Sequence, residues 1–341
     1  MINIISKSYC SRLVSGPKKV VDNLIKGLDL IGYPYVVNRR LDACRRLWIH
    51  DDAAALKKIN KLPGNIKVVL GPNLFVLPRQ IPPDINLSAA VYLQPSDWVR
   101  NFWKEFGFNK CPIAVWPAGI DTAEFSPVPA HKRQVILYYK QRQAGELAQV
   151  KRALSSKNIG YHVLYYGKYS EKDYKRHLAS ARYMVWLGRQ ESQGIALEEA
   201  LSADVPVIVC DVKNLGHWSA SQKEMAVFNQ GENAYAGVTS CPYFDASCGV
   251  QIKDLDGLDQ ALEDMEAGWK NFQPRRYVLN NLSLEKQARD FVGIFGKYFG
   301  LSYEDGLKER LLKKGDWVNS YPLARVKFFV KDFTKGFNNF K

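Results

Sequence analysis

The sequence predicts an α/β protein of two parallel-sheet domains, followed by a C-terminal helical extension. Short apolar runs alternate with longer amphipathic segments, which is the pattern of strands and helices in a parallel sheet. The alternation stops at a polar, proline-containing stretch and then starts again. A chain of 341 residues has the length of two ordinary domains, and contents of 46% hydrophobic and 24% charged residues are those of a globular protein.

The first domain is expected over residues 1–125. The run INIIS at 2–6 reads as a strand, and the amphipathic segment that follows it predicts a helix that closes at Gly32. A second helix is expected over 96–107, with Ser96 or Asp97 as its cap and Gly107 just past its end. Five further strands are expected at 33–38, 45–52, 66–72, 89–95 and 113–119.

The second domain is expected over residues 126–282, after a linker that contains Pro127 and Pro129. Its strands are expected at 135–139, 161–167, 183–188 and 205–211, and its helices at 144–154, 170–181 and 194–203. Because sheets of this class bind ligands beyond the carboxyl ends of their strands, we expect two such domains to face each other across a cleft.

The extension covers residues 283–341 and is expected to begin with a helix over 283–300, capped by Ser283. Further on, apolar residues at alternating spacings of three and four form one stripe with Lys and Arg residues beside it. This stripe packs on the fold, lies on an anionic membrane surface or contacts nucleic acid. Its members are Leu323, Val326, Val330, Phe333, Phe337 and Phe340.

The net charge is +14, and residues 307–341 alone carry nine Lys or Arg against three Asp or Glu. A basic chain attracts anionic partners, which include nucleic acid, anionic lipid and phosphorylated small molecules. The six cysteines form no CxxC pair, so we expect reduced thiols and no zinc site. The N-terminus does not resemble a secretory signal and no run approaches a membrane span of about 20 apolar residues. We therefore expect a cytoplasmic protein, and residues 323–340 are the segment through which it would associate with the cytoplasmic face of a membrane if the stripe does not pack on the fold.

The stretch ESQGIALEEALSADVPVIV at 191–209 places carboxylates on both sides of the point where a loop becomes a helix. The backbone N–H groups of Gln193, Gly194 and Ile195 would lie at the positive end of that helix, which favours a bound phosphate. Glu191 and Glu199 accept hydrogen bonds only, and this suits a ligand rich in hydroxyl groups. The alternative is that both glutamates only cap and solvate the start of the helix.

The same stretch resembles the E-x7-E signature of retaining GT-B glycosyltransferases, whose usual form is E-[S/G]-F-G-L-x-L-L-E-A-M-A-x-G-x-P-V-I. Two other segments resemble the same family in the same order. WPAGIDTAEFSP at 116–127 is similar to its PNGVDxxxFxP segment, and CGVQIKDLDGLDQAL at 248–262 is similar to the segment that follows the motif. The resemblance implies a GT-B fold of two facing Rossmann-like domains, with the acceptor domain first and the nucleotide-sugar donor domain second.

The resemblance also implies roles for individual residues. Glu199 matches the glutamate that contacts the donor ribose, and Glu191 matches the one near the sugar or its phosphate. Gln193, Gly194 and Ile195 would surround the diphosphate. The family neutralises the diphosphate with an Arg…Lys pair after the first donor-domain strand. Here Lys140 and Arg142 are available, although their spacing departs from R-x4-K.

Two residues of the first domain complete the expected site. Gly16 stands where the family has a glycine-rich loop that approaches the donor. His50 follows an expected strand and is a loose positional match to a histidine near the reacting sugar. The alternative is that Gly16 is an ordinary turn glycine and His50 an ordinary histidine at the end of a strand.

The implied activity is transfer of a sugar from a nucleotide-sugar donor to a glycan or lipid-linked acceptor, with retention of configuration, as in polysaccharide biosynthesis. Cations and a helix N-terminus would stabilise the leaving diphosphate, so we expect neither a metal nor a cofactor besides the donor. One alternative is a non-catalytic binding or scaffold protein of the same fold. Another is a nucleic-acid-binding protein, which leaves the motif matches unexplained. A hydrolase or an epimerase is the alternative among enzymes.

Overall fold

The computed structural model describes residues 1–128, 134–219, 224 and 226–317. The chain forms two compact units. Unit 1 contains Met1–Gln94, Gly107–Gly119 and the described residues from Leu284 onward, and unit 2 contains Pro95–Phe106 and Ile120–Ser283. The sequence predicts domain boundaries at 125/126 and 282/283. In the structure, the corresponding boundaries between the two units lie at 119/120 and 283/284. The predicted stripe at 323–340 lies outside the described residues.

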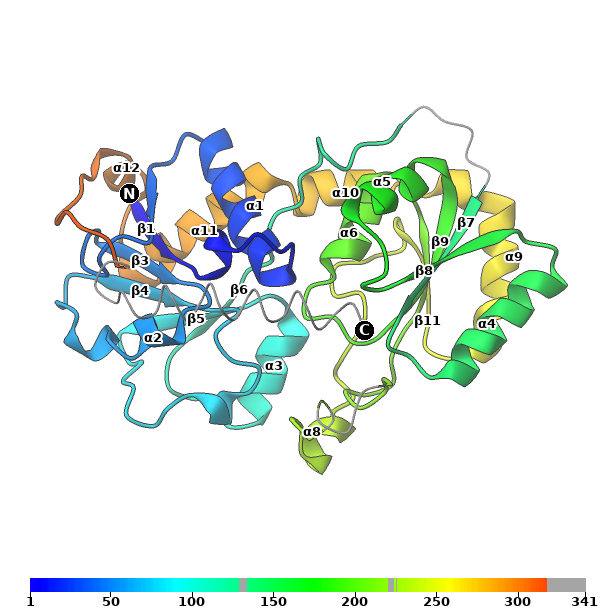
Figure 1. Cartoon of the computed structure of the whole chain (residues 1–341), viewed down its shortest axis with the longest axis horizontal. Helices are drawn as coiled ribbons and strands as arrows, with labels where there is room; N and C mark the ends of the chain where they lie inside the picture. Colours follow the sequence, from blue (N-terminus) through cyan, green and yellow to red (C-terminus); the bar gives the residue numbers. More distant parts are fainter. Residues whose placement is uncertain (129–133, 220–223, 225, 318–341) are drawn as a thin grey trace. The chain divides into compact units, whose positions relative to one another are not determined.

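Unit 1 contains a six-stranded parallel sheet in the order β2-β1-β3-β4-β5-β6 (Figure 1). The strands are β1 (Ile2–Ile5), β2 (Tyr35–Val37), β3 (Arg46–Ile49), β4 (Lys67–Leu70), β5 (Ala90–Gln94) and β6 (Ile113–Val115). The helices are α1 (Gly16–Leu30), α2 (Ala53–Leu56), α11 (Leu284–Phe299) and α12 (Tyr303–Lys308). Short 3-10 turns lie at Ser8–Cys10, Ile59–Lys61 and Pro78–Gln80.

The C-terminal helix α11 packs against α1 in unit 1. A Cβ atom on Gly27 of α1 would lie 2.5 Å from the carbonyl oxygen of Leu284, so glycine permits this close approach. The rings of Trp48, Trp116 and Phe291 meet edge to face, with centroids 5.0–6.0 Å apart. Helix α11, predicted over 283–300, is therefore part of the core of the unit that holds the N-terminus.

Unit 2 contains a five-stranded parallel sheet in the order β11-β10-β9-β7-β8. The strands are β7 (Gln134–Lys140), β8 (Tyr161–Tyr165), β9 (Ala181–Gly188), β10 (Val207–Cys210) and β11 (Gly249–Ile252). The helices are α3 (Asp97–Glu105), α4 (Ala144–Ser156), α5 (Glu171–Ser180), α6 (Ile195–Ser202), α8 (Gln230–Ala234), α9 (Leu258–Gly268) and α10 (Pro274–Asn281). Two 3-10 turns lie at Leu255–Gly257 and Trp269–Asn271.

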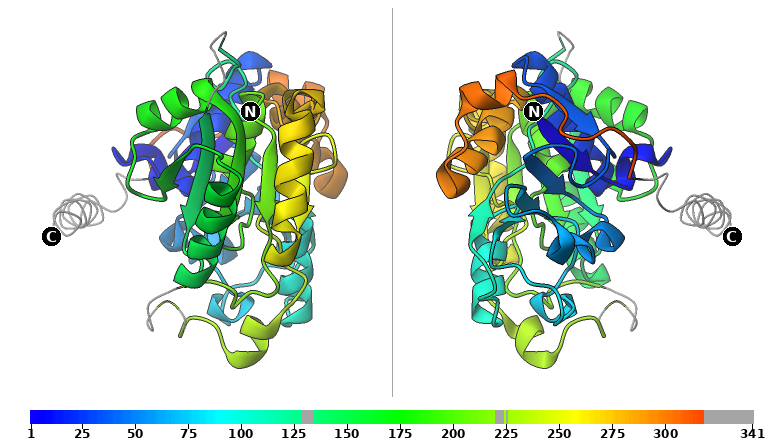
Figure 2. Two further views of the ribbon diagram at one scale, coloured as in Figure 1. Left: turned by 90° about the vertical axis from the view of Figure 1, so that its right-hand side faces the viewer. Right: turned by 90° about the vertical axis from the view of Figure 1, so that its left-hand side faces the viewer.

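Helices cover both faces of the second sheet, as Figure 2 shows for α4 and α9 on one side. Two buried apolar clusters correspond to the two faces: one includes Tyr174, Leu178 and Leu201 of α5 and α6. The other includes Val150 of α4 and Leu262 of α9. Both sheets are thus parallel and covered by helices, which confirms the predicted α/β class with two Rossmann-like domains.

Helix α3 is part of unit 2, although β5 and β6, which precede and follow it in the chain, are part of unit 1. It begins after Ser96 and ends before Gly107, whose φ of +91° favours glycine. The sequence predicted this helix and its ends but placed it in the first domain.

The described residues contain no helix that is long and apolar enough to cross a membrane.

Candidate functional site

Chain topology predicts a ligand-binding crevice at the carboxyl ends of β7 and β9 of unit 2. Numbered within the unit, the strand order is 2-1-3-4-5, and the connections leave β7 and β9 toward opposite sides of the sheet. Sheets of this kind bind ligands beyond the carboxyl ends of the two strands at the point where the direction reverses. Strand β7 ends at Lys140 and β9 ends at Gly188, so the predicted motif begins at the expected place.

The loop after β9 leads into α6 through Gly194, which has a φ of +98° and is the N-cap of the helix. Its left-handed backbone favours glycine over any residue with a side chain. The first turn of an α-helix leaves backbone N–H groups without intrahelical partners, and the glycine cap carries no side chain to meet them. The structure thus forms the predicted helix N-terminus, with Gln193 before it and Ile195 as its first residue.

Lys140 and Glu191 form an ion pair across this crevice. The distance from Lys140 Nζ to Glu191 Oε1 is 2.5 Å, and each side chain is 14% exposed. Lys140 Nζ also lies 4.2 Å from the ring centroid of Tyr166, which follows β8 and is more than half exposed. Lys140 is thereby held at the mouth of the crevice by an anion on one side and an aromatic face on the other.

Glu199 lies one turn into α6 and is buried, with 3% of its surface exposed. Its charge acts on two tyrosines beside α6, Tyr169 and Tyr174. Burial raises the pKa of Tyr169 to about 12, and the charges of Glu199 and Glu191 add to that rise. Both glutamates of the motif therefore lie close enough to Tyr169 to raise the pKa of its hydroxyl group.

Glu198 is a third carboxyl group at this helix, and the sequence analysis assigned it no role. It is fully buried, and its Oε2 accepts a hydrogen bond of 2.8 Å from Gln193 Nε2. Burial raises the pKa of Glu198 well above its usual value, and the nearby Glu199 and Glu191 add to the rise. Burial therefore favours the protonated form of Glu198, and its carboxyl group holds the side chain of Gln193.

Arg142 does not share the surroundings of Lys140. Its side chain is 1% exposed, and its Nη1 donates to the carbonyl oxygens of Gly188 (3.1 Å) and Cys210 (2.8 Å). Its Nε donates to Glu146 of α4 at 3.0 Å. Burial alone would raise the pKa of Glu146, but His217 and Arg142 together lower it to about 2. The contacts of Arg142 are those of a residue that joins β9, β10 and α4.

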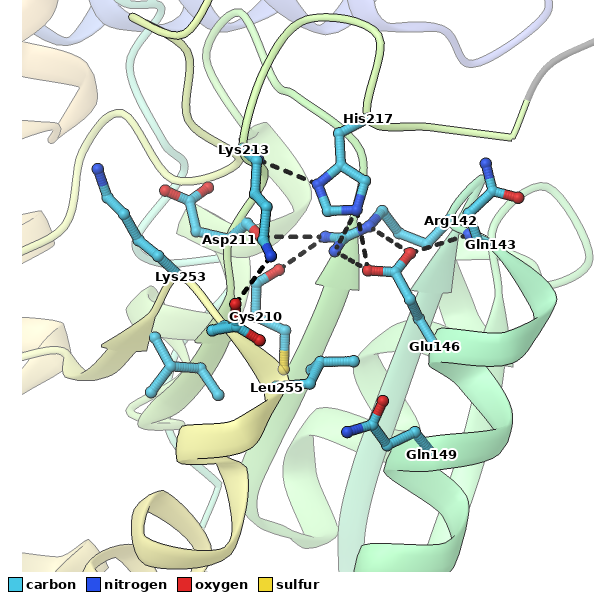
Figure 3. A pocket seen from close by; sticks show the side chains of 12 residues that line it. Arg142, Gln143, Glu146, Gln149, Cys210, Asp211, Lys213, His217, Lys253 and Leu255 are labelled. Carbon is cyan, nitrogen blue, oxygen red and sulfur yellow. Dashed lines mark hydrogen bonds and ion pairs between the residues drawn. The ribbon is translucent and has the colours of Figure 1, made fainter.

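A cavity of about 290 Å³ adjoins Arg142 at the carboxyl ends of β10 and β11. Figure 3 shows Arg142, Glu146 and His217 on one side of it and Lys213 and Lys253 on the other. Lys213 pairs with Asp254 at 2.8 Å. Neither Lys140 nor Glu191 lines this cavity, so it is separate from the crevice between β7 and β9.

Gly16 and His50 lie in unit 1, whereas the other predicted site residues lie in unit 2. Gly16 is the first residue of α1 and follows the cap Ser15, and a Cβ atom there would meet nothing within 4 Å. His50 follows β3 and is fully buried, with its Nε2 2.9 Å from the carbonyl oxygen of Pro17. Burial lowers the pKa of His50, so the imidazole is neutral at pH 7.

Three other residues follow the ends of strands in unit 2 and were not singled out from the sequence. Arg189 follows β9 and lies with its guanidinium carbon 4.1 Å from the ring centroid of Trp218. Asp211 follows β10, and Tyr166 follows β8. Because each of them lies at the end of a predicted strand or directly after it, the sequence could have indicated them as candidate ligand-binding residues. Trp98, which donates a hydrogen bond of 2.9 Å to the carbonyl oxygen of Glu191, carried no such signal.

Comparisons with solved structures place this architecture among known folds. The chain is similar to sucrose-phosphate synthase from Thermosynechococcus elongatus, with a TM-score of 0.56 and 12% identity over 88% of this chain and 99% of that one. It is also similar to the apo form of the lipopolysaccharide outer core galactosyltransferase WaaB, with a TM-score of 0.50 and 12% identity over 87% of this chain and 99% of that one. No protein-family model and no curated protein sequence matches the chain. These similarities, together with the two parallel sheets, define a GT-B fold built from two Rossmann-like units.

Proposed function

We propose that the protein is a glycosyltransferase that moves a sugar from a nucleotide-sugar donor to a glycan or lipid-linked acceptor, with retention of configuration. The observation that carries the proposal is the Lys140–Glu191 pair beside the glycine-capped start of α6. It brings a cation, an anion-binding helix end and an acceptor-only carboxylate together at the reversal point of the sheet. The two similar structures are named as enzymes of sucrose-phosphate synthesis and galactosyl transfer, which agrees with this proposal.

The donor diphosphate would bind at the N–H groups of Gly194 and Ile195, with Lys140 beside it. Breaking the sugar–phosphate bond leaves negative charge on the diphosphate, and preorganised donors stabilise that charge in the transition state. In the unliganded site Lys140 is paired with Glu191. On donor binding the ammonium group turns to the phosphate, and the carboxylate of Glu191 then accepts hydrogen bonds from the sugar hydroxyls.

The remaining predicted residues have supporting places in this proposal. Glu199 accepts hydrogen bonds from the ribose hydroxyls, and Gln193, held by Glu198, shapes the loop around the diphosphate. Arg142 fixes the β7–α4 loop from behind, because its donors are bound to protein carbonyls and to Glu146. Contact of Gly16 and His50 with the donor, and reaction without a metal, remain predictions.

A second candidate function is a non-catalytic sugar-nucleotide-binding protein of the same fold. The burial of Arg142 favours it, since the site then has one partly exposed cation at the end of β7 where the resemblance implies two. Binding without turnover would distinguish this candidate from the enzyme.

The test is release of nucleoside diphosphate from UDP-, GDP-, ADP- and dTDP-sugars by the full chain. We expect one donor to be hydrolysed slowly, and we expect Lys140→Ala and Glu199→Gln to abolish the reaction. Lys157→Ala is the matched control and should retain full activity, because Lys157 directly follows α4 and pairs with the exposed Glu263 of α9. Turnover that persists in both site variants would contradict the site, and binding without turnover would favour the second candidate.

A further inference from the structure

The peptide groups on both sides of Glu191 are held by residues far away in the sequence. The carbonyl oxygen of Glu191 accepts a hydrogen bond of 2.9 Å from the indole Nε1 of Trp98. The backbone N–H of Glu191 donates to the carbonyl oxygen of Thr239 at 3.1 Å. With the side chain bound to Lys140, Glu191 is therefore fixed at three points, and all three partners lie outside the motif at 191–209.

Trp98 is carried by α3, which is anchored to unit 2 at both ends. At its start, the hydroxyl group of Tyr243 donates to the carbonyl oxygen of Pro95 at 2.6 Å. Toward its end, the ring of Phe102 packs against Tyr235 with centroids 5.2 Å apart. The indole group therefore reaches Glu191 from a helix whose own position is set by the segment between β10 and β11.

Thr239 is fixed by Asp211, the residue directly after β10. Asp211 is 2% exposed, and its carboxylate accepts four hydrogen bonds from protein groups. Oδ1 accepts from the backbone N–H and the hydroxyl group of Ser240, at 2.6 and 3.0 Å. Oδ2 accepts from the hydroxyl group of Thr239 at 3.0 Å and from Gln251 Nε2 at 2.8 Å. A buried carboxylate with four donors sets the course of the segment TSC at 239–241.

The same segment lies against the start of α6. A Cβ atom built on Gly194 would be 3.8 Å from the carbonyl oxygen of Ser240 and 3.9 Å from Cδ of Pro242. The segment 239–242 therefore contacts both the loop that carries Glu191 and the glycine cap. A shift of this segment would move the carboxylate and the anion-binding helix end together.

We propose that Trp98 and Asp211 are positioning residues that set the location of the Glu191 carboxylate in the sugar-transfer site. This inference rests on the proposed function, because it assigns Glu191 to the sugar side of the donor. A reacting group has to be held within about 0.5 Å of its productive place. Misplacement by about 1 Å can lower the rate by about 100-fold, even when the altered residue touches no substrate.

Trp98→Phe removes the indole donor and keeps an aromatic ring on α3. The matched control is Trp116→Phe, because Trp116 Nε1 also donates to a backbone carbonyl oxygen at 2.9 Å, that of Gln287, within unit 1. We expect Trp98→Phe to lower kcat at least tenfold, with KM for the donor changed less than threefold. Trp116→Phe should retain the kcat of the unmodified chain. Equal kcat values in the two variants would overturn the proposal.

Asp211→Asn provides an independent test if Trp98→Phe does not fold. Its control is Asp254→Asn, which alters an exposed aspartate on the 3-10 turn after β11. We expect a kcat loss in Asp211→Asn alone, and an unchanged kcat there would count against the proposal.

Hydrogen–deuterium exchange of the peptide that contains residues 189–195 separates this inference from the proposed function. Faster exchange in Trp98→Phe than in Trp116→Phe would support positioning even if the chain turns over no nucleotide-sugar. Unchanged exchange in both variants would refute positioning, whatever the activity.

Discussion

Lys140 Nζ at the end of β7 lies 2.5 Å from Glu191 Oε1 in the loop after β9. The two strands flank the point where the direction of the sheet connections reverses, so this ion pair occupies the place where ligands bind in sheets of this class. Each partner neutralises the other in the unliganded protein, and an anionic ligand would separate them.

Replacement of Lys140 by Met leaves the largely buried carboxylate of Glu191 without its cation. We expect the free energy of unfolding to fall by about 1–3 kcal/mol, the cost of removing a partner from a charged hydrogen bond. The affinity for nucleoside diphosphate should fall at least tenfold, about 1.4 kcal/mol. Urea denaturation and calorimetric titration measure the two effects. Lys157→Met, the control, should alter neither, and a diphosphate affinity unchanged in Lys140→Met would contradict the assignment.

Substitution of Gly194 by Ala tests the helix end. The space around a Cβ atom there is ordinary, since its nearest neighbour would be Glu191 Cβ at 3.7 Å, but the φ of +98° disfavours any side chain. We expect a loss of stability of about 1–3 kcal/mol and weaker binding of diphosphate. In α4, Gly145→Ala has open space and should stabilise the protein by about 0.5–1 kcal/mol. If denaturation curves showed both variants to be more stable than the unmodified protein, the φ of Gly194 would not disfavour a side chain as we expect.

The buried Glu198 predicts a pH dependence of stability. Its pKa is raised in the folded state, so the folded protein keeps a proton that the unfolded chain loses above the ordinary value of 4.5. The carboxyl group therefore destabilises the fold increasingly as the pH rises above 4.5 toward the folded-state pKa. Glu198→Gln should remove this slope, so the stability it gains over the unmodified protein should be larger at pH 8 than at pH 5. A pH-independent difference would show that Glu198 is ionised in the fold, and exposed Glu285→Gln serves as the control.

Replacement of Arg142 and replacement of Lys140 should have different effects on stability and on diphosphate affinity. Because Arg142 is buried with Glu146 and two carbonyl groups as partners, Arg142→Met should lower the free energy of unfolding by about 3–5 kcal/mol. Folded Arg142→Met protein, measured below its unfolding transition, should bind nucleoside diphosphate within about threefold of the unmodified chain. A specific loss of diphosphate affinity with little loss of stability would return Arg142 to the ligand-binding role expected from the sequence.

The sequence predicted both sheets, because strand and helix periods are local properties that neighbouring residues carry. It also placed Glu191 and Gly194 correctly at the loop-to-helix junction after β9. It did not separate Lys140 from Arg142, since a difference of two residues gives no information about the turn between them. Gln141 adopts a φ of +51°, and after it Arg142 contacts Glu146 of α4 while Lys140 contacts Glu191.

The features that the sequence did not predict depend on contacts between residues that are far apart in the chain. The amphipathic period of α3 is visible in the sequence, but its packing against Tyr235 depends on residues more than 120 positions away. Glu198 occupies a position whose burial follows from the packing of α6, and its raised pKa follows from that burial. The role of a residue that depends on such contacts can be assigned only when the fold is known.

The diphosphate site between β7 and β9 is best tested by calorimetric titration of the full chain and of Lys140→Met with UDP-, GDP-, ADP- and dTDP-sugars. We expect one donor to bind and Lys140→Met to weaken its binding at least tenfold, whereas Lys157→Met should bind it normally. A donor that binds Lys140→Met as tightly as the unmodified chain, or no binding by any of the four, would contradict a diphosphate site between β7 and β9.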